Sequence, residues 1–241
     1  MKTLFKIHNL TYISFLIAFL TGYFKEMMIF MSIIIIHESG HILAALLFKW
    51  NIEKIVILPF GGIIVFNELI NKPLIEEFII TIAGPLFQIL FTILINNSIL
   101  TFYSKIILFI NLIPIYPLDG AKLLNIFLNK ILSFKTSHKL TIYISYLLGL
   151  IFLIFMFIKR EYIYFFTILL LVIKLKLELK NHDIIFNKFL YERYLYDLKF
   201  KKARIVSRLE KLKKDYLHYI NVNNNLINEK EYLKNKYFQN H

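Results

Sequence analysis

The segment HESGH, residues 37–41, carries the side chains with the clearest capacity for chemistry. His37 and His41 are four residues apart, so on a helix their imidazoles lie about 40° apart around the axis and roughly 6 Å apart along it. Both can therefore bind one metal ion. Glu38 points elsewhere on the same helix and suits a general base that takes a proton from metal-bound water. The chemistry indicated is hydrolysis.

The surroundings of these residues strengthen the metal hypothesis. They lie within the aliphatic run IIIIHESGHILAALL, residues 33–47. Ionisable groups at membrane depth are costly without partners and usually mark functional sites. The chain has no cysteine, so nitrogen and oxygen atoms must supply the ligands. Two histidines with a carboxylate favour zinc.

A catalytic zinc site needs a third protein ligand and an open position for water. Asp119 is the best candidate, because it follows the broken segment NLIPIYPLDGAK, residues 111–122. Pro114 and Pro117 cannot sustain a helix there, and Gly120 permits unusual backbone angles. Broken backbone at membrane depth is tolerated only where it is buried in protein or lines a cavity. The segment is therefore expected to end at a site.

Other ionisable residues are weaker candidates. An Asp-Gly pair also occurs in ordinary turns, so Glu76 and Glu77, at the start of an apolar segment, stay possible ligands, although they are expected to be interfacial charges. The remaining histidines are expected to be solvated in loops or the tail: His8, His138, His182, His218 and His241.

Composition places this site in a membrane protein. The chain has 241 residues, of which 58% are hydrophobic and 19% charged. Soluble proteins average about 45–50% apolar and about 25% charged residues. Much of the net charge of +13 lies from residue 180 to residue 241, where there are 14 lysines and arginines against 7 aspartates and glutamates. Orientation in the membrane and attraction to anionic lipid explain this charge, so nucleic acid is not an expected partner.

Six apolar segments are long enough, or nearly so, for the roughly 20 residues that a membrane-spanning helix needs. They are residues 9–24, 27–48, 75–95, 98–115, 140–158 and 161–177. The predicted fold is an all-α integral membrane protein, with a membrane-embedded domain at 1–179 and a basic cytoplasmic tail at 180–241. Six crossings return the chain to its starting side, and the distribution of lysine makes both termini cytoplasmic.

A β-hairpin is expected after the second span. In NIEKIVILPFGGIIVFNE, residues 51–68, β-branched residues flank a turn at 59–62. An exposed hairpin edge can pair with an extended peptide by strand addition. The candidate substrate-binding residues on that edge are Ile63, Ile64, Val65 and Phe66. Asn111, on the broken segment, can hold a substrate backbone group with its amide.

Several motifs together resemble the site-2 protease family of intramembrane zinc metalloproteases. They are HESGH, LPFGG, AGPLFQ at 83–88, NLIPIYPLDGAK, and FLYERY at 189–194, in matching order over about residues 1–200. The resemblance is strongest to the sporulation stage IV factor B group. It implies that His37, His41 and Asp119 are zinc ligands, that Glu38 is the catalytic acid/base, and that Asn111 contacts the substrate.

The resemblance also implies a biological setting. It suggests regulated intramembrane proteolysis of a membrane-associated sporulation sigma-factor precursor, membrane-bound inhibitory proteins, and a place in the membrane around the forespore. Relatives carry a nucleotide-responsive CBS domain where this chain has a short tail rich in Lys and Asn. The tail is either an abridged version of that domain or a basic helical segment, so nucleotide regulation is not predicted.

Two alternatives remain at this level. One is an integral-membrane zinc endopeptidase resembling the heat-shock or prenyl-processing enzymes, with a glutamate in place of Asp119. The other is a metal transporter or binder without proteolytic activity. The proline-broken Asp-Gly segment argues against the first alternative. The spare Glu38 within a complete H-E-x-x-H pattern argues against the second.

Overall fold

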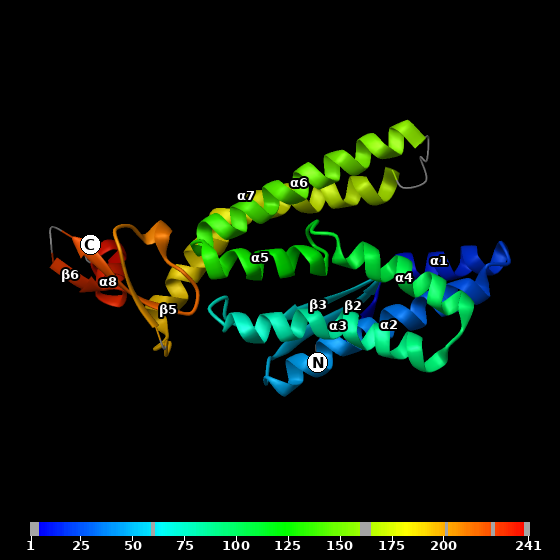
Figure 1. The fold of residues 1–241 in the computed structure, drawn as a ribbon, viewed down its shortest axis with the longest axis horizontal. Coiled ribbons are helices and arrows are strands. Elements are labelled where there is room, and N and C mark those ends of the chain that lie inside the picture. The colour runs from blue at the N-terminus through cyan, green and yellow to red at the C-terminus, as the bar shows by residue number, and fades with distance from the viewer. Residues whose placement is uncertain (1–4, 59–60, 160–164, 201, 223–224, 239–241) are drawn as a thin grey trace. The chain divides into compact units, whose positions relative to one another are not determined.

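The computed structural model describes residues 5–58, 61–159, 165–200, 202–222 and 225–238 (Figure 1). The chain divides into two compact units, which are treated separately below. The first contains residues 1–68 and 76–112, and the second contains residues 69–75 and 113–241.

Four helices build most of the first unit: α1 (Asn9–Leu20), α2 (Phe24–Leu47), α3 (Leu74–Ile95) and α4 (Ser98–Leu112). Helices α2 and α3 approach each other closely at Gly40, where an added Cβ would lie 2.5 Å from the carbonyl oxygen of Ala83. Ala44 and Ala45 of α2 pack with Ile80 and Ala83 of α3 in a buried cluster. Small residues thus let the two backbones approach in an apolar setting.

The first unit also contains a small sheet. Strands β2 (Ile52–Leu58) and β3 (Gly61–Phe66) form the antiparallel hairpin that the sequence predicts, although residues 59–60 of its turn lie outside the described part. A strand that the sequence analysis missed, β1 (Phe5–Ile7), pairs in parallel with β2. The strand order is β1-β2-β3, so within the described residues β3 is an edge strand.

Three helices begin the second unit: α5 (Asp119–Ile131), α6 (Phe134–Lys159) and α7 (Phe165–Leu195). Figure 1 shows α6 and α7 running side by side, in green and yellow. Helix α5 begins directly after the proline-containing segment, as Pro114 and Pro117 require. Helix α7 continues without a break through residue 180, where the tail is expected to start.

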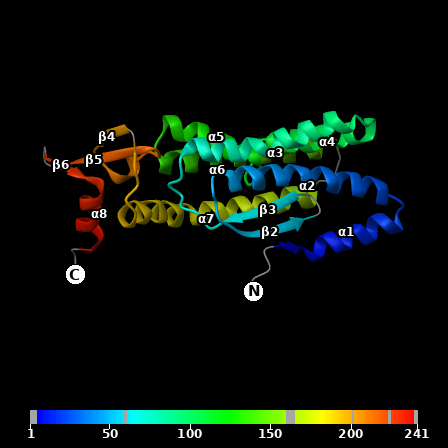
Figure 2. The same ribbon diagram turned by 90° about the horizontal axis from the view of Figure 1, so that it is seen from below.

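The tail folds into a small sheet with a helix beside it (Figure 2). Its elements are β4 (Lys202–Val206), the 3₁₀ helix η2 (Leu209–Lys211), β5 (Tyr216–Val222), β6 (Asn225–Asn228) and α8 (Glu229–Phe238). Strand β5 is central, with β4 parallel and β6 antiparallel to it. The sequence left open whether the tail is a basic helical segment. The tail instead contains a three-stranded sheet as well as a helix.

The prediction of an all-α protein with about six spans is borne out only in part. The described structure is mostly helical but includes two three-stranded sheets. Among the described helices, α2, α3 and α6 are long and apolar enough to cross a membrane, whereas α1 and α4 are shorter apolar helices. Residues 161–164 of the sixth predicted segment lie outside the described part. The six-span topology stays a prediction.

The prediction that the additional histidines are solvated is wrong for three of them. His138, His182 and His218 are buried, because α6 begins earlier and α7 ends later than the apolar segments suggest, and because the tail has a core. His138 and His182 meet at the α6–α7 pair, with their Nδ1 atoms 2.8 Å apart. His8 is exposed, as expected, and caps α1. His241 lies outside the described residues.

FLYERY contributes a buried ionic cluster to the second unit. The Arg193 guanidinium donates to the Glu229 carboxylate at 2.9 Å, and its Nε donates to Asn71 Oδ1 at 2.9 Å. Glu192 Oε2 accepts from the side-chain amide of Asn71 at 3.0 Å. The arginine side chain is fully buried, so removing one partner would leave an uncompensated charge. This cluster ties α7 to α8 and to the segment 69–75.

His218 has a tautomer fixed by its partners in the tail. Its Nε2 accepts from the Lys213 backbone N–H at 3.1 Å, and its Nδ1 lies 2.9 Å from Glu229 Oε2. The ring is therefore neutral, with its proton on Nδ1. Burial lowers the pKa of His218 below 6.5 more than the bond to Glu229 raises it. A second proton would displace the Lys213 amide.

Candidate metal centre

The two histidines of HESGH lie on one face of α2, as their spacing predicts. His37 and His41 are 2% and 5% exposed, so both imidazoles are buried. Their Nε2 atoms lie 3.2 Å apart. Two nitrogens bound tetrahedrally to one zinc at about 2.0–2.1 Å would be separated by about 3.3 Å. The spacing of the pair therefore matches a shared metal ion.

The orientation of His37 is set by a buried amide on α3. Gln88 Nε2 donates to the Ser104 carbonyl at 2.8 Å and lies 3.1 Å from the Ser104 hydroxyl. This leaves Gln88 Oε1 to face His37 Nδ1 at 2.8 Å. An amide oxygen only accepts, so Nδ1 of His37 carries the ring proton. Nε2 is then the unprotonated nitrogen, which is the form that can bind a metal.

The orientation of His41 is set by a backbone carbonyl of α3. Its Nδ1 lies 2.7 Å from the carbonyl oxygen of Ile80, which can only accept. Nε2 of His41 therefore also carries a lone pair. Gly84 leaves room for this ring, because an added Cβ there would lie 2.3 Å from Nε2. A glycine is thus required beside the imidazole, one turn beyond Ile80.

These hydrogen bonds supply a test of whether the residues fit a metal. Both Nδ1 atoms face acceptors, so the two Nε2 atoms are the nitrogens that can bind a metal, and they lie 3.2 Å apart. Partners that fix the tautomer and the ring plane are typical of metal-binding histidines. The histidine pair therefore fits zinc without rearrangement.

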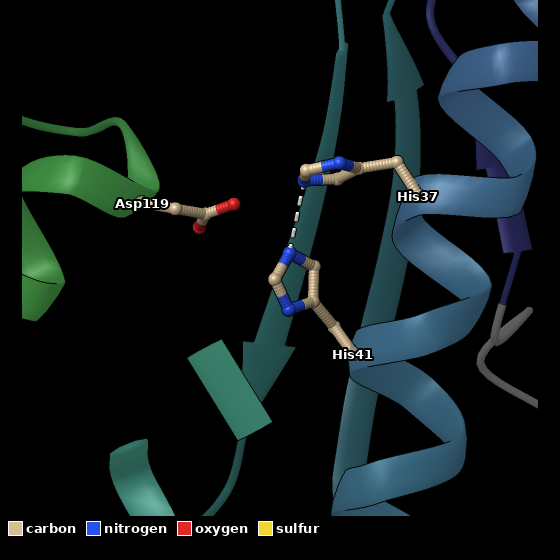
Figure 3. Close-up of side chains that lie close together, drawn as sticks. All are labelled: His37, His41 and Asp119. Carbon is tan, nitrogen blue, oxygen red and sulfur yellow. Dashed lines mark hydrogen bonds between the residues drawn. The ribbon is translucent and has the colours of Figure 1, made fainter. Parts of the chain in front are cut away.

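Asp119 supplies the third candidate ligand. Within the described residues, His37, His41 and Asp119 form a group of potential ligands whose nearest atoms all lie within 4.8 Å of one another. Figure 3 shows the Asp119 carboxylate pointing toward the two imidazoles. Lys122 Nζ donates to Asp119 Oδ1 at 2.9 Å. A carboxylate can accept this bond and still ligate a metal, because it has two oxygens.

Glu38 stays outside this group of ligands, as the H-E-x-x-H spacing predicts. Its side chain turns toward the hairpin, where Oε1 accepts from the Gly62 backbone N–H at 3.0 Å. Glu38, the candidate base, is therefore hydrogen-bonded to β3, whereas His37 and His41 belong to the group of potential ligands.

The alternative glutamates do not join the group. Glu76 accepts from the indole N–H of Trp50 at 2.8 Å, an interaction between α3 and the segment that follows α2. Neither Glu76 nor Glu77 belongs to the potential ligand group found among the described residues. Among the described residues, Asp119 is therefore the carboxylate that groups with the histidine pair, and its role as third ligand stays a prediction.

The substrate-binding candidates lie on α4 and β3. Asn111 is half-buried in the last turn of α4. Ile63 and Val65 are exposed on β3, whereas Ile64 and Phe66 are half-buried. Their roles stay predictions.

Sequence analysis missed the residues that orient the ligands. Gln88 is fully buried and stands within the quoted motif AGPLFQ, but no role was assigned to it. A glutamine within an apolar span is itself a signal, since polar side chains in membrane segments need partners. The sequence predicts only that Gly62 belongs to a hairpin turn. Its contact with Glu38 joins residues 24 positions apart, so no local pattern indicates it.

Comparison with known proteins identifies the family. The profile of Peptidase family M50 matches residues 25–103. Stage IV sporulation protein FB of Bacillus subtilis (strain 168) is 36% identical over 206 residues, which is 78% of this chain and 70% of that protein. This chain belongs to the site-2 protease family. The protease is therefore a zinc metalloprotease, and family membership argues against both alternatives raised above.

Two matches from Methanocaldococcus jannaschii, one in sequence and one in structure, extend the comparison. The zinc metalloprotease MJ0392 of Methanocaldococcus jannaschii is 32% identical to this protease over 137 residues, or 51% of this chain and 40% of that protein. The solved structure of the site-2 protease from Methanocaldococcus jannaschii matches with a TM-score of 0.57 and 26% identity, and the match covers 74% of this chain and 92% of that one. The fold and the family thus agree.

Proposed function

We propose that this protease cleaves a membrane-associated sporulation sigma-factor precursor, with His37, His41 and Asp119 as zinc ligands and Glu38 as the acid/base. One observation carries the site assignment. Two oriented Nε2 lone pairs and one carboxylate form a single group of potential ligands, and Glu38 stands beside that group without joining it. Bound zinc would supply a water with a pKa of about 7 and would polarise the scissile carbonyl.

The protein's own residues would then handle protons and geometry. Glu38 takes the proton from the attacking water and returns it to the leaving amine, as a general base and then a general acid. Gln88 and the Ile80 carbonyl keep the two imidazoles in the required tautomer. These contacts hold the site in place before substrate arrives, so little reorganisation accompanies the reaction.

We propose that substrate binds as an added strand on β3. A helical substrate hides its peptide bonds in intrahelical hydrogen bonds and must be extended before attack. The residues involved are Ile63, Ile64, Val65 and Phe66 on the edge strand, with Asn111 holding a substrate backbone group.

The cellular setting is proposed from the resemblance to the sporulation group. The precursor is the membrane protein substrate, and membrane-bound inhibitory proteins hold the enzyme off until a signal arrives. The proposed location is the membrane around the forespore, with both termini cytoplasmic. The name of the Bacillus relative, a sporulation protein, supports this setting. The tail sheet and α8 are consistent with an abridged CBS-like remnant after residue 180.

Co-expression with the precursor tests this function. Wild type and Glu38→Gln are compared on one immunoblot, because glutamine keeps the ligands while removing the base. Cleavage by wild type only supports both the substrate and the role of Glu38. Cleavage by neither, with both proteins stably in the membrane, counts against this substrate. Cleavage by both contradicts the role of Glu38.

A further inference from the structure

The hydrogen-bond pattern of the first sheet shows which backbone groups the β3 edge presents. The carbonyl of Ile57 accepts from the His8 N–H at 3.0 Å, so Ile57 directs its backbone groups toward the β1 side of β2. The N–H and C=O of one strand residue point to the same side. Gly62 is the partner of Ile57 in the β2–β3 register, so its backbone groups point away from β2.

The other end of β3 agrees with this assignment. The Asn67 N–H donates to the Asn51 carbonyl at 2.9 Å, which places residue 67 on the β2 side. Backbone direction alternates along a strand, so Gly62, Ile64 and Phe66 present their N–H and C=O groups to the unpaired edge.

Glu38 already occupies the first of these edge positions. Its Oε1 accepts the outward N–H of Gly62 at 3.0 Å. A Cβ at residue 62 would lie 2.5 Å from the Glu38 carboxyl carbon, so only glycine leaves room for this contact. The base candidate thus stands where the ladder of an added strand would end, and the donors beyond it belong to Ile64 and Phe66.

The β3 edge strand is fixed in position relative to α2, the helix that carries Glu38. At the far end of β3, Phe66 packs on the buried cluster containing Ala44 and Ala45 of α2. Its ring also meets the Trp50 ring edge-on at 5.4 Å between centroids. Both ends of β3 are therefore fixed to α2, so a peptide paired with this edge has a defined position relative to Glu38.

We propose that Gly62 is a positioning residue that sets where the substrate is cut. Its N–H holds Glu38 at the end of the edge, so a substrate strand pairs with Ile64 and Phe66 and the next peptide bond along the ladder meets Glu38. The cleaved bond then lies about two residues from the substrate position paired with Ile64. This inference rests on the proposed strand addition to β3.

Disulfide mapping tests the register without depending on turnover. The chain has no cysteine, so Ile63→Cys or Val65→Cys in the Glu38→Gln background introduces a single thiol on an exposed edge position. The probe is the sigma-factor precursor carrying one cysteine at successive positions around its cleavage site. Ile63→Cys should crosslink most strongly within about one residue of the cleaved bond, and Val65→Cys about two residues farther away.

Kinetics of Gly62→Ala test the contact itself. The clash falls on the flexible end of Glu38, so the hairpin can persist while the carboxylate moves. We expect kcat to fall at least about tenfold while KM changes less than about twofold, because the edge still binds substrate. Gly149→Ala is the matched control, since a Cβ there meets nothing within 4 Å.

Several results would overturn the proposal. Unchanged kcat in Gly62→Ala removes the positioning role. Loss of the Val65→Cys crosslink in Gly62→Ala shows that Gly62 merely supports the hairpin. Crosslinks that do not shift by two residues between positions 63 and 65 overturn the register. If wild type leaves the precursor intact, the proposed substrate fails instead, which separates the two claims.

Discussion

Replacing Gln88 with leucine should weaken zinc binding without unfolding the first unit. The side chain is fully buried and makes three contacts, one to His37 Nδ1 at 2.8 Å and two to Ser104 at 2.8 and 3.1 Å. Leucine is of similar size but removes the acceptor that holds the His37 tautomer. Loss of such a partner lowers metal affinity about 10–100-fold, equivalent to roughly 1.4–2.7 kcal/mol.

The assay is chelator competition on the purified protein in detergent, followed by cleavage of the precursor at saturating zinc. Gln88→Glu is the matched variant, because it keeps an acceptor for His37 while losing the donors to Ser104. It should retain more zinc affinity than Gln88→Leu. A zinc affinity for Gln88→Leu within about twofold of wild type would refute the argument that this amide orients the ligand.

Three further outcomes follow from the structure. Gly84→Ala should abolish zinc binding, because its Cβ would overlap the ring of His41. Gly149→Ala, whose Cβ meets nothing within 4 Å, should retain zinc in the same metal analysis. Gly40→Ala should destabilise the protein by about 1–3 kcal/mol in thermal unfolding, since its clash is with α3 backbone. The tail should lose stability as pH falls below about 6.5. Burial lowers the pKa of His218 in the folded tail, so the unfolded chain binds the extra proton at a higher pH and is stabilised by it. Hydrogen exchange of β5 at pH 5.5 and 7.5 checks this loss, and His218→Gln should flatten it.

Local patterns predicted the reactive part of the protein. The i, i+4 spacing of His37 and His41 fixes their relation on any helix, and Pro114 and Pro117 force a break before Asp119. The hairpin likewise follows from β-branched runs around a turn. Each of these signals is contained within a few neighbouring residues.

The features that sequence analysis missed depend on contacts between distant residues. Strand β1 is three residues long, too short for a recognisable alternation, and exists because β2 offers an edge. His138 and His182 lie 44 residues apart and are buried only because α6 and α7 pair. The tail core forms around residues such as Phe189 and Ile220, which apolar-segment counting does not connect.

Metal content of the purified protein tests the central claim most directly. The site assignment predicts about one zinc per chain in wild type and in Glu76→Ala, and less than about a tenth of that in Asp119→Ala, with all three proteins equally folded in the membrane. Retention of zinc by Asp119→Ala together with its loss from Glu76→Ala would contradict the His37, His41 and Asp119 centre.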